Sequence, residues 1–230
     1  MFDKEKNNGR LRDCRKCRQI LVESIRKFDL VDGQKIYARQ HIMLSLLRGI
    51  DLFDDGIVLL DNGRLTSAII IARSFFEQVG HTARIVQILS ENKNDEIKTE
   101  KLLRDLNNSS ELRSRIFKGE IDPNLIYTNE AKEKFGKKTP VTETKKFIEA
   151  LQLSLTSFGD TENKARLMYS ALSEYSHPTF FSLATVYIKN RPPVLTSFGL
   201  LSPDEVMRSY TIYSFSLMAL LAHIWTFSLD

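Results

Sequence analysis

Polar residues gather at the end of a predicted helix in the stretch YSALSEYSHPTF, residues 169–180. Tyr169, Ser173 and His177 are four residues apart and therefore share one helical face, and Pro178 ends the helix directly after the histidine. The carboxyl end of a helix carries partial negative charge, which favours a protonated imidazole. His177 is therefore a candidate acid or base near neutral pH. The alternative is a helix cap that only bonds the last carbonyl groups.

A second polar stripe lies on the predicted helix that contains ARSFFEQVGHTAR. Arg73, Glu77, His81 and Arg84 follow one another at steps of four, four and three residues, which places them on one face. The predicted core face of this helix consists of Ile69, Ala72, Phe76, Val79 and Ala83. Arg73 and Glu77 therefore either lie partly buried or face a groove. The alternative is an ordinary intrahelical ion pair, worth a few tenths of a kcal/mol.

The cysteines and the acidic residues do not predict a metal site. Cys14 and Cys17 form C-R-K-C, but a structural zinc ion needs four ligands and the chain has no second cysteine pair. We therefore expect two reduced thiols on an N-terminal helix. The second helix holds His41, Asp51, Asp54 and Asp55, without a His/Glu ligand pair four residues apart. No glycine-rich phosphate loop is present, and we expect neither a metal nor a cofactor.

Hydrophobic periodicity predicts the helices that must hold these residues. Apolar residues at helical spacing predict helices at 10–28, 35–60 and 64–90, and later ones at 143–158 and 161–177. The apolar face of the first helix is predicted to be Ile20, Leu21, Ile25 and Phe28. The Asn-Gly pair before residue 64 is a strong turn signal. A loop this short makes two long helices antiparallel, as an αα-hairpin.

Two further segments differ in composition from the rest. Residues 91–146 are rich in charge and poor in helical apolar spacing, which indicates a charged helical insertion or mobile surface, with short helices near 94–107 and 109–118. Residues 203–228 predict one long apolar helix that begins at Pro203. Polar residues interrupt it well short of the roughly twenty apolar residues that a membrane span needs. We therefore interpret it as core or as a dimer interface.

The composition is that of one helical domain. The 230 residues are 42% hydrophobic and 27% charged, with only ten glycines and six prolines. We predict an all-α fold, an antiparallel up-and-down bundle built on the αα-hairpin, with residues 1–230 as a single domain. No apolar stretch follows a charged start, so we expect a cytoplasmic protein and no membrane insertion. Residues 1–39 hold eleven Lys/Arg against six Asp/Glu, an excess that permits RNA binding or simply improves solubility.

Two motifs together resemble those of a known group of proteins. ARSFFE on the third helix and YSALSEYSHPT on a later one resemble the R-S-x-x-E and S-x-x-x-H-P motifs of a widespread set of uncharacterised bacterial helical proteins. Those proteins are similar in turn to the HEPN group of helical bundles (higher eukaryotes and prokaryotes nucleotide-binding). The shared pattern covers residues 35–90 and 160–190.

The resemblance implies an α-helical bundle that forms a homodimer. It also implies a metal-independent endoribonuclease, or toxin effector, of a bacterial toxin–antitoxin or antiphage defence system. In such an enzyme a histidine moves a proton of the ribose 2′-OH while an arginine stabilises the phosphorane. The residues expected to do this are His177 and Arg73, with Glu77 orienting one of them and with Tyr169 and Ser173 as supporting hydrogen-bond partners. The expected ligands are RNA and a protein from the same system.

This chain differs from the HEPN hallmark, in which an arginine and a histidine lie a short gap apart on one helix. Arg166 precedes His177 on the same helix, but the gap places them on different faces. The alternative function is therefore a non-catalytic helical interaction module, such as an antitoxin-like partner, a sensor or an oligomerising scaffold. In that case the same polar residues form a structural lock between helices.

Overall fold

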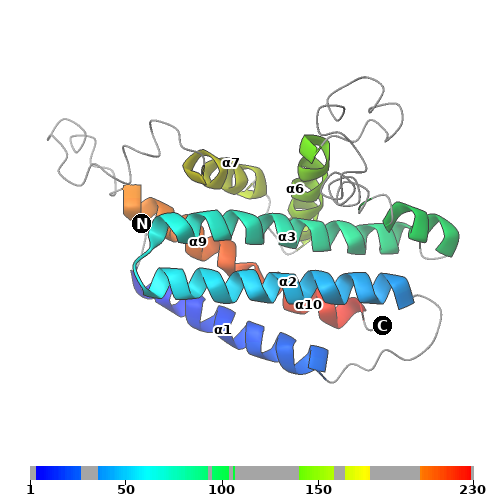
Figure 1. Cartoon of the computed structure of the whole chain (residues 1–230), viewed down its shortest axis with the longest axis horizontal. Coiled ribbons are helices and arrows are strands. Elements are labelled where there is room, and N and C mark those ends of the chain that lie inside the picture. Colours follow the sequence, from blue (N-terminus) through cyan, green and yellow to red (C-terminus); the bar gives the residue numbers. More distant parts are fainter. Residues whose placement is uncertain are drawn as a thin grey trace, which may run out of the picture.

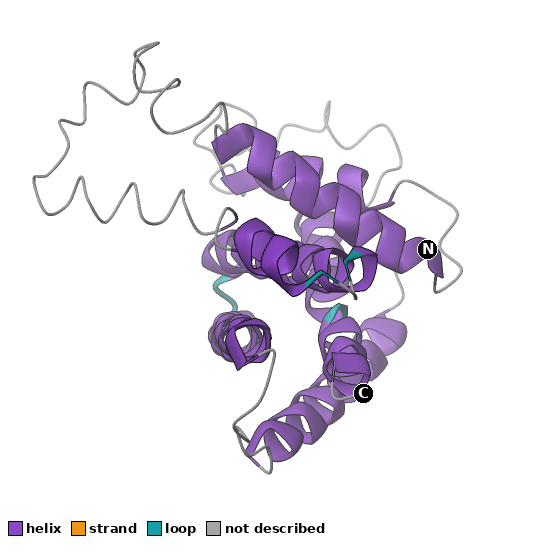
Figure 2. Ribbon diagram, turned by 90° about the vertical axis from the view of Figure 1, so that its right-hand side faces the viewer, coloured by secondary structure: helices purple, strands orange, loops and turns teal. Residues whose placement is uncertain are grey.

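The computed structural model describes residues 4–26, 36–92, 95–103, 106, 140–157, 164–176 and 203–228. Its helices are α1 (Lys4–Arg26), α2 (Ile36–Asp61), α3 (Leu65–Glu91), α6 (Pro140–Ser157), α7 (Lys164–Ser176), α9 (Pro203–Ser216) and α10 (Met218–Ser228) (Figure 1). Throughout this part of the chain Figure 2 shows helices and connecting loops and no strand. The predicted all-α helical bundle is confirmed.

The turn between α2 and α3 sets the hairpin. Gly63 has a φ of 69°, in the left-handed region that suits glycine. Its N–H donates to the carbonyl of Leu60, and the N–H of Arg64 donates to the carbonyl of Leu59. These two bonds close the end of α2 in a Schellman motif. The chain then reverses within three residues, so that α2 and α3 lie side by side and antiparallel (Figure 1).

Helix α3 is the centre of the bundle. It packs against α2, α6, α7, α9 and α10. Its buried residues recur at helical spacing and are Ala68, Ile69, Ala72, Phe75, Phe76, Val79, Gly80, Thr82, Ala83, Ile85 and Ile88. All five residues of the predicted core face belong to this set, and Phe75 on a neighbouring face is buried as well. A helix covered on so many sides is held firmly, and this rigidity extends to the polar residues that it carries.

Two glycines of α2 allow the C-terminal helices to approach closely. Phe215 of α9 packs against Phe53 of α2 and Phe75 of α3, with ring centroids 5.8 and 5.6 Å apart. A Cβ atom at Gly56 would lie 2.0 Å from that phenylalanine ring, and one at Gly49 would lie 2.8 Å from Leu221. The aromatic cluster is therefore compatible only with glycine at position 56.

The C-terminal segment differs from the single helix expected over 203–228. It begins at Pro203, as predicted, but α9 and α10 are separated at Leu217, whose N–H bonds the carbonyl of Ser214 three residues back. The hydroxyls of Ser214 and Ser216 also bond carbonyls of the preceding turn. Serine side chains that bond the backbone in this way bend helices. Both helices bury apolar residues in the core. Of the two roles expected for this segment, core or dimer interface, these residues have the first.

No helix within the described residues is both long and apolar enough to cross a membrane.

The charged segment 91–146 is only partly described. Residues 96–103 are helical, within the short helix expected near 94–107, and Leu103 is fully buried. Helix α6 begins at Pro140, so the last residues of the predicted insertion belong to a core helix instead. Proline is favoured in the first turn of a helix, where its missing N–H would have no intrahelical acceptor. The helix expected at 109–118 lies outside the described residues.

Helix α1 packs on α9 and α10 with a face that only partly matches the prediction. The predicted apolar residue Ile20 is 63% exposed. The buried residues are Leu11, Cys14, Leu21 and Ile25, at steps of three, seven and four residues along one face. Leu21 and Ile25 were predicted; Phe28 lies outside the described residues. The predicted free thiols are present, and burial raises the pKa of Cys14 to about 12, so this thiol stays protonated.

Two ion pairs fix α1 antiparallel to α2. Arg15 bonds Asp61 at 2.8 Å, and Arg18 bonds both carboxylate oxygens of Asp54 at 3.0 and 2.5 Å. The higher-numbered arginine pairs with the lower-numbered aspartate, as antiparallel helices require. Two of the basic residues in the N-terminal excess are therefore neutralised by aspartates of α2 in the same chain.

We predict that Gly56→Ala destabilises the fold by about 1–3 kcal/mol or more, because the added methyl group overlaps the ring of Phe215. Urea unfolding measures this change. Gly9→Ala is the matched control: a Cβ at Gly9 meets nothing within 4 Å, so this variant should gain roughly 0.5–1 kcal/mol from helix propensity. Equal stability of the Gly56→Ala variant and the wild type would contradict the close approach.

Candidate functional site

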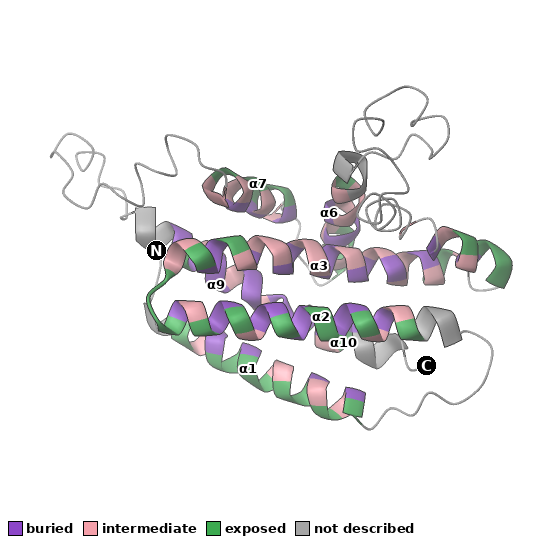
Figure 3. Ribbon diagram, in the orientation of Figure 1, coloured by how far each residue is buried: buried purple, intermediate pink, exposed green. Residues whose placement is uncertain are grey.

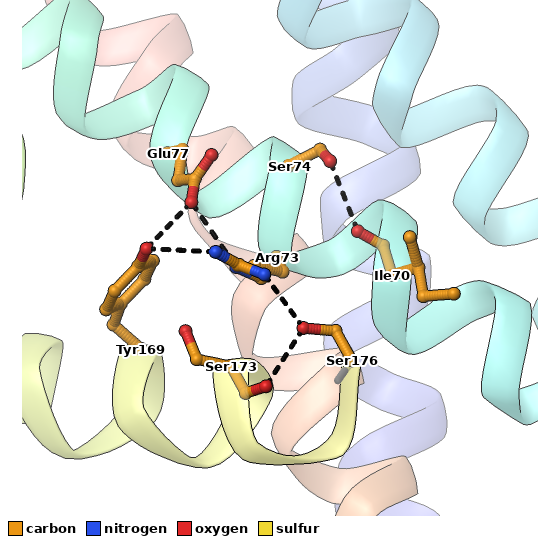
Figure 4. Close-up of polar contacts among 7 residues, drawn as sticks. All are labelled: Ile70, Arg73, Ser74, Glu77, Tyr169, Ser173 and Ser176. Carbon is orange, nitrogen blue, oxygen red and sulfur yellow. Dashed lines mark hydrogen bonds and ion pairs between the residues drawn. The ribbon is translucent and has the colours of Figure 1, made fainter. Parts of the chain in front are cut away.

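The polar residues of α3 and α7 meet around the guanidinium group of Arg73 (Figure 4). Its Nη1 donates to Ser176 Oγ at 3.0 Å, and its Nη2 donates to Tyr169 Oη at 3.3 Å. Its Nε lies 3.3 Å from Glu77 Oε1. The hydroxyl of Tyr169 donates to the same carboxylate oxygen at 2.8 Å. We call these four side chains the Arg73 cluster.

Packing of α7 on α3 produces this arrangement. Ala165, Met168 and Leu172 bury the inner face of α7, at steps of three and four residues. Tyr169 follows Met168, and its ring lies 6.4 Å from the ring of Phe76 on α3. Arg73 is one helical turn from that phenylalanine, and its guanidinium carbon lies 5.6 Å from the centre of the tyrosine ring. The cluster therefore stands on side chains that the core holds in place.

The Arg73 cluster lies at the edge of the core. The side chains of Arg73 and Glu77 are 26% and 35% exposed. A charge in this position is screened less than at the surface, so its hydrogen bonds are stronger than those of an exposed pair. It is also within reach of solvent, as a ligand-binding group must be.

Three of the five predicted site residues meet in this cluster: Arg73, Glu77 and Tyr169. Ser173 contributes its main-chain carbonyl, which accepts a hydrogen bond from Ser176 at 3.1 Å, while its own Oγ is buried without a hydrogen-bond partner among the described residues. His177 lies outside the described residues and follows Ser176 directly in the sequence.

Sequence reasoning missed Ser176, although helical geometry could have found it. Seven residues turn an α-helix by about 700°, which returns Ser176 to within about 20° of Tyr169. Four residues leave Ser173 about 40° away on the other side. Ser176 is therefore better aligned with Tyr169 than Ser173 is, and it is the serine that bonds Arg73.

The other half of the predicted α3 stripe does not join the cluster. Steps of four rotate side chains by about 40° each, so His81 is turned about 80° away from Arg73. Its Nδ1 lies 3.1 Å from the hydroxyl of Ser45 on α2, and its ring packs edge-on against Phe147 of α6. Arg84 bonds Gln87 within α3.

His81 belongs to a separate polar network between α2 and α3. Ser45 Oγ also accepts from Gln78 Nε2 at 2.6 Å and from Thr82 Oγ1 at 3.1 Å. Burial, together with the nearby imidazole of His41, lowers the pKa of His81 to about 4. This histidine is therefore neutral at physiological pH, and the network fixes the register of the hairpin.

No group of three or more His, Cys, Asp or Glu side chains is close enough to hold a metal ion in the part of the chain that the structure describes. Asp54, one of the carboxylates considered above for a metal, instead bonds Arg18. The chemistry of the Arg73 cluster is thus that of a fixed cation, a carboxylate and hydroxyl groups. Such a set can bind an anion and orient a proton-transfer group.

Residues 40–192 match the model of DUF5677, a family of unknown function. The chain belongs to this family. The DUF5677 match includes α2 from residue 40 onward, α3, α6 and α7, and with them every member of the Arg73 cluster. All of α1, α9 and α10 lie outside it. No curated protein and no solved structure matches the chain.

We predict that Tyr169→Phe lowers the free energy of unfolding by about 1–3 kcal/mol, because Arg73 and Glu77 lose a shared partner in a partly buried site. In a chain that already carries Arg73→Leu, the same change should cost clearly less. Denaturant unfolding of the four chains gives this coupling. Arg166→Ala, which breaks an exposed pair with Glu149, is the control and should cost under about 1 kcal/mol. An equal cost of Tyr169→Phe in both backgrounds would contradict the network.

We predict that His81 makes stability depend on pH. Its pKa in the folded chain is about 4, against 6.5 for an unperturbed histidine. Between these values the unfolded chain binds a proton that the folded chain does not, so stability falls as the pH drops from about 6.5 to about 4.

The variant His81→Asn should remove about 2–3 kcal/mol of this decline, as measured by urea unfolding across that pH range. His223→Asn changes an exposed histidine of α10 and should leave the decline unchanged. A His81→Asn variant that loses stability as steeply as the wild type would show that His81 is not the group responsible.

Proposed function

We propose that this DUF5677 protein is a metal-independent endoribonuclease that acts in the cytoplasm as the toxin effector of a bacterial antiphage defence or toxin–antitoxin system. One observation carries the proposal: Arg73 is held by three side chains in a partly exposed position, next to the end of the helix whose following residue is His177. The resemblance of the two motifs to HEPN proteins favours RNA as the substrate.

The proposed reaction is an internal transesterification. The ribose 2′-oxygen attacks the adjacent phosphorus atom, the P–O5′ bond breaks, and the products carry a 2′,3′-cyclic phosphate and a 5′-hydroxyl group. One proton leaves the 2′-OH and one is delivered to O5′. Because the nucleophile belongs to the RNA, the reaction requires no metal-bound water.

Each residue has a role that follows from its chemistry. His177 takes or gives the proton, a step that general acid–base catalysis accelerates about 10²–10⁴-fold. Arg73 stabilises the charge of the phosphorane, and Glu77 orients Arg73 through the contact at 3.3 Å. Tyr169 and Ser176 fix the other two guanidinium nitrogens, and Ser173 lies beside them on α7.

A second candidate function is a non-catalytic interaction module in such a system. The observation that favours it is that the members of the cluster contact one another: Glu77 neutralises the charge of Arg73, and Tyr169 bonds both. If this function is correct, the network has no catalytic role and only holds α7 on α3. The two functions make opposite predictions for RNA cleavage.

The test is a comparison of wild type, His177→Ala and Arg73→Lys at matched soluble levels in a bacterial host. We expect the wild type to arrest growth and fragment RNA, and both variants to do neither. The purified wild type should cleave RNA in EDTA and leave cyclic phosphate ends. Loss of the proton-transfer group should slow this cleavage at least about 10²-fold.

Two control variants make the result specific. His223→Ala changes an exposed histidine on α10, and Arg84→Ala changes an arginine of α3 that bonds Gln87 of the same helix. Both should keep full activity. If the wild type is silent and His177→Ala and Arg73→Lys only lower the melting temperature, the endoribonuclease proposal is wrong and the cluster is a structural lock.

A further inference from the structure

Helix α2 has a face that none of the other described helices covers. Exposed bands recur along α2 in the view of Figure 3, on the side away from the C-terminal helices. Leu44 and Val58 on this face are 62% and 60% exposed, and Leu47 is 39% exposed. Exposed apolar residues that recur along one helical face are typical of interaction sites, unlike single scattered ones.

Charged residues separate the apolar ones on this face. Arg48, Asp51 and Asp55 are exposed, and none of them has an ion-pair partner among the described residues. The other two acidic residues of α2 behave differently, because Asp54 and Asp61 bond arginines of α1. The charges on the outer face of α2 therefore make no ion pair with any other part of the chain that the structure describes.

The order of these residues is self-complementary. Leu44, Arg48, Asp51, Asp55 and Val58 follow one another at alternating steps of four and three residues, the spacing of a helix–helix contact about 21 Å long. Read from one end the order is apolar, basic, acidic, acidic, apolar. A second α2 in the antiparallel direction places apolar ends on apolar ends and each Arg48 beside an acidic residue.

We propose that the outer face of α2 is the docking surface for a second copy of this chain, in an antiparallel and two-fold symmetric pair. Leu44 of one copy meets Val58 of the other, and Arg48 of one copy lies beside Asp55 of the other. Each contact occurs twice, as two-fold symmetry requires. The buried residues of α9 and α10 pack against the inner side of the α2–α3 hairpin. The surface for the second copy is on the opposite, outer side of that hairpin.

The same register has a second consequence, at Asp51. The two copies of Asp51 lie nearest to the two-fold axis, where their like charges repel. Asp51→Asn should therefore strengthen association, although it removes a charge and makes no new contact inside the chain. An interface elsewhere on the molecule would not respond in this way.

The experiment is sedimentation velocity over a range of micromolar concentrations. We expect the wild type to sediment with twice the chain mass of 26.5 kDa. Arg48→Asp and Asp55→Arg should each weaken association about tenfold or more, because each puts like charges together at both symmetric contacts. Leu44→Lys, a substitution at an exposed site, should do the same without affecting folding, and Lys101→Asp is the charge-reversal control that should change nothing.

Mixing the two charge variants gives the decisive outcome. A pair of one Arg48→Asp chain and one Asp55→Arg chain has opposite charges at both contacts, so the mixture should associate again although each variant alone does not. No contact within one chain can produce this rescue. A wild type that stays monomeric, a dimer that resists the single variants, or a mixture that stays monomeric would each overturn the proposal.

Discussion

The ring of Phe215 reaches the space between α2 and α3 only because position 56 has no side chain. There it completes an aromatic cluster with Phe53 and Phe75, with ring centroids between 5.6 and 6.2 Å apart. This contact seats α9, and α9 in turn packs against α1, α3 and α7. The absence of a side chain at Gly56 therefore allows the hairpin and the C-terminal helices to pack together. It also explains why helices outside the DUF5677 match are part of the same core: the hairpin alone would leave this aromatic surface exposed to water.

Helix α3 connects this core to the candidate site. Ala72, Phe75 and Phe76 are fully buried, and Arg73 lies between them in the sequence. The backbone of Arg73 is thus fixed by packing on both sides, and the hydrogen bonds to α7 need only fix its side chain. Ordering a long arginine costs up to about 2 kcal/mol of side-chain entropy. A rigid backbone and three contacts from neighbouring side chains already order this arginine, so this entropy is lost on folding and not on ligand binding. An anion would then meet a guanidinium group that is already oriented.

The sequence predicts those features that depend on local pattern. The Asn-Gly turn, the apolar face of α3 and the shared face of Arg73 and Glu77 follow from turn chemistry and helical spacing. That Tyr169 lies beside them was expected only from the resemblance of the two motifs. The sequence does not predict features that depend on tertiary contacts. Ile20 is as apolar as Leu21, and only the packing of α1 on α9 and α10 decides which of them is buried. The break at Leu217 comes from serine–backbone bonds that a hydrophobicity pattern does not register. His81 leaves the stripe because a step of four residues does not repeat the helical turn, an error that grows with each step.

Stability and chemistry make different demands on the Arg73 cluster. A structural lock is best when every polar group is satisfied and water is excluded, because partial exposure weakens each bond. A phosphate-binding site needs the opposite at one point, a cation that an incoming anion can reach. The 26% exposure of Arg73 exceeds what a sealed lock requires, while its bond to Ser176 ties its position to the end of α7. A ligand that displaced this guanidinium group would therefore also strain the last turn of α7. In this geometry Arg73 and the end of α7 are coupled through a single serine hydroxyl.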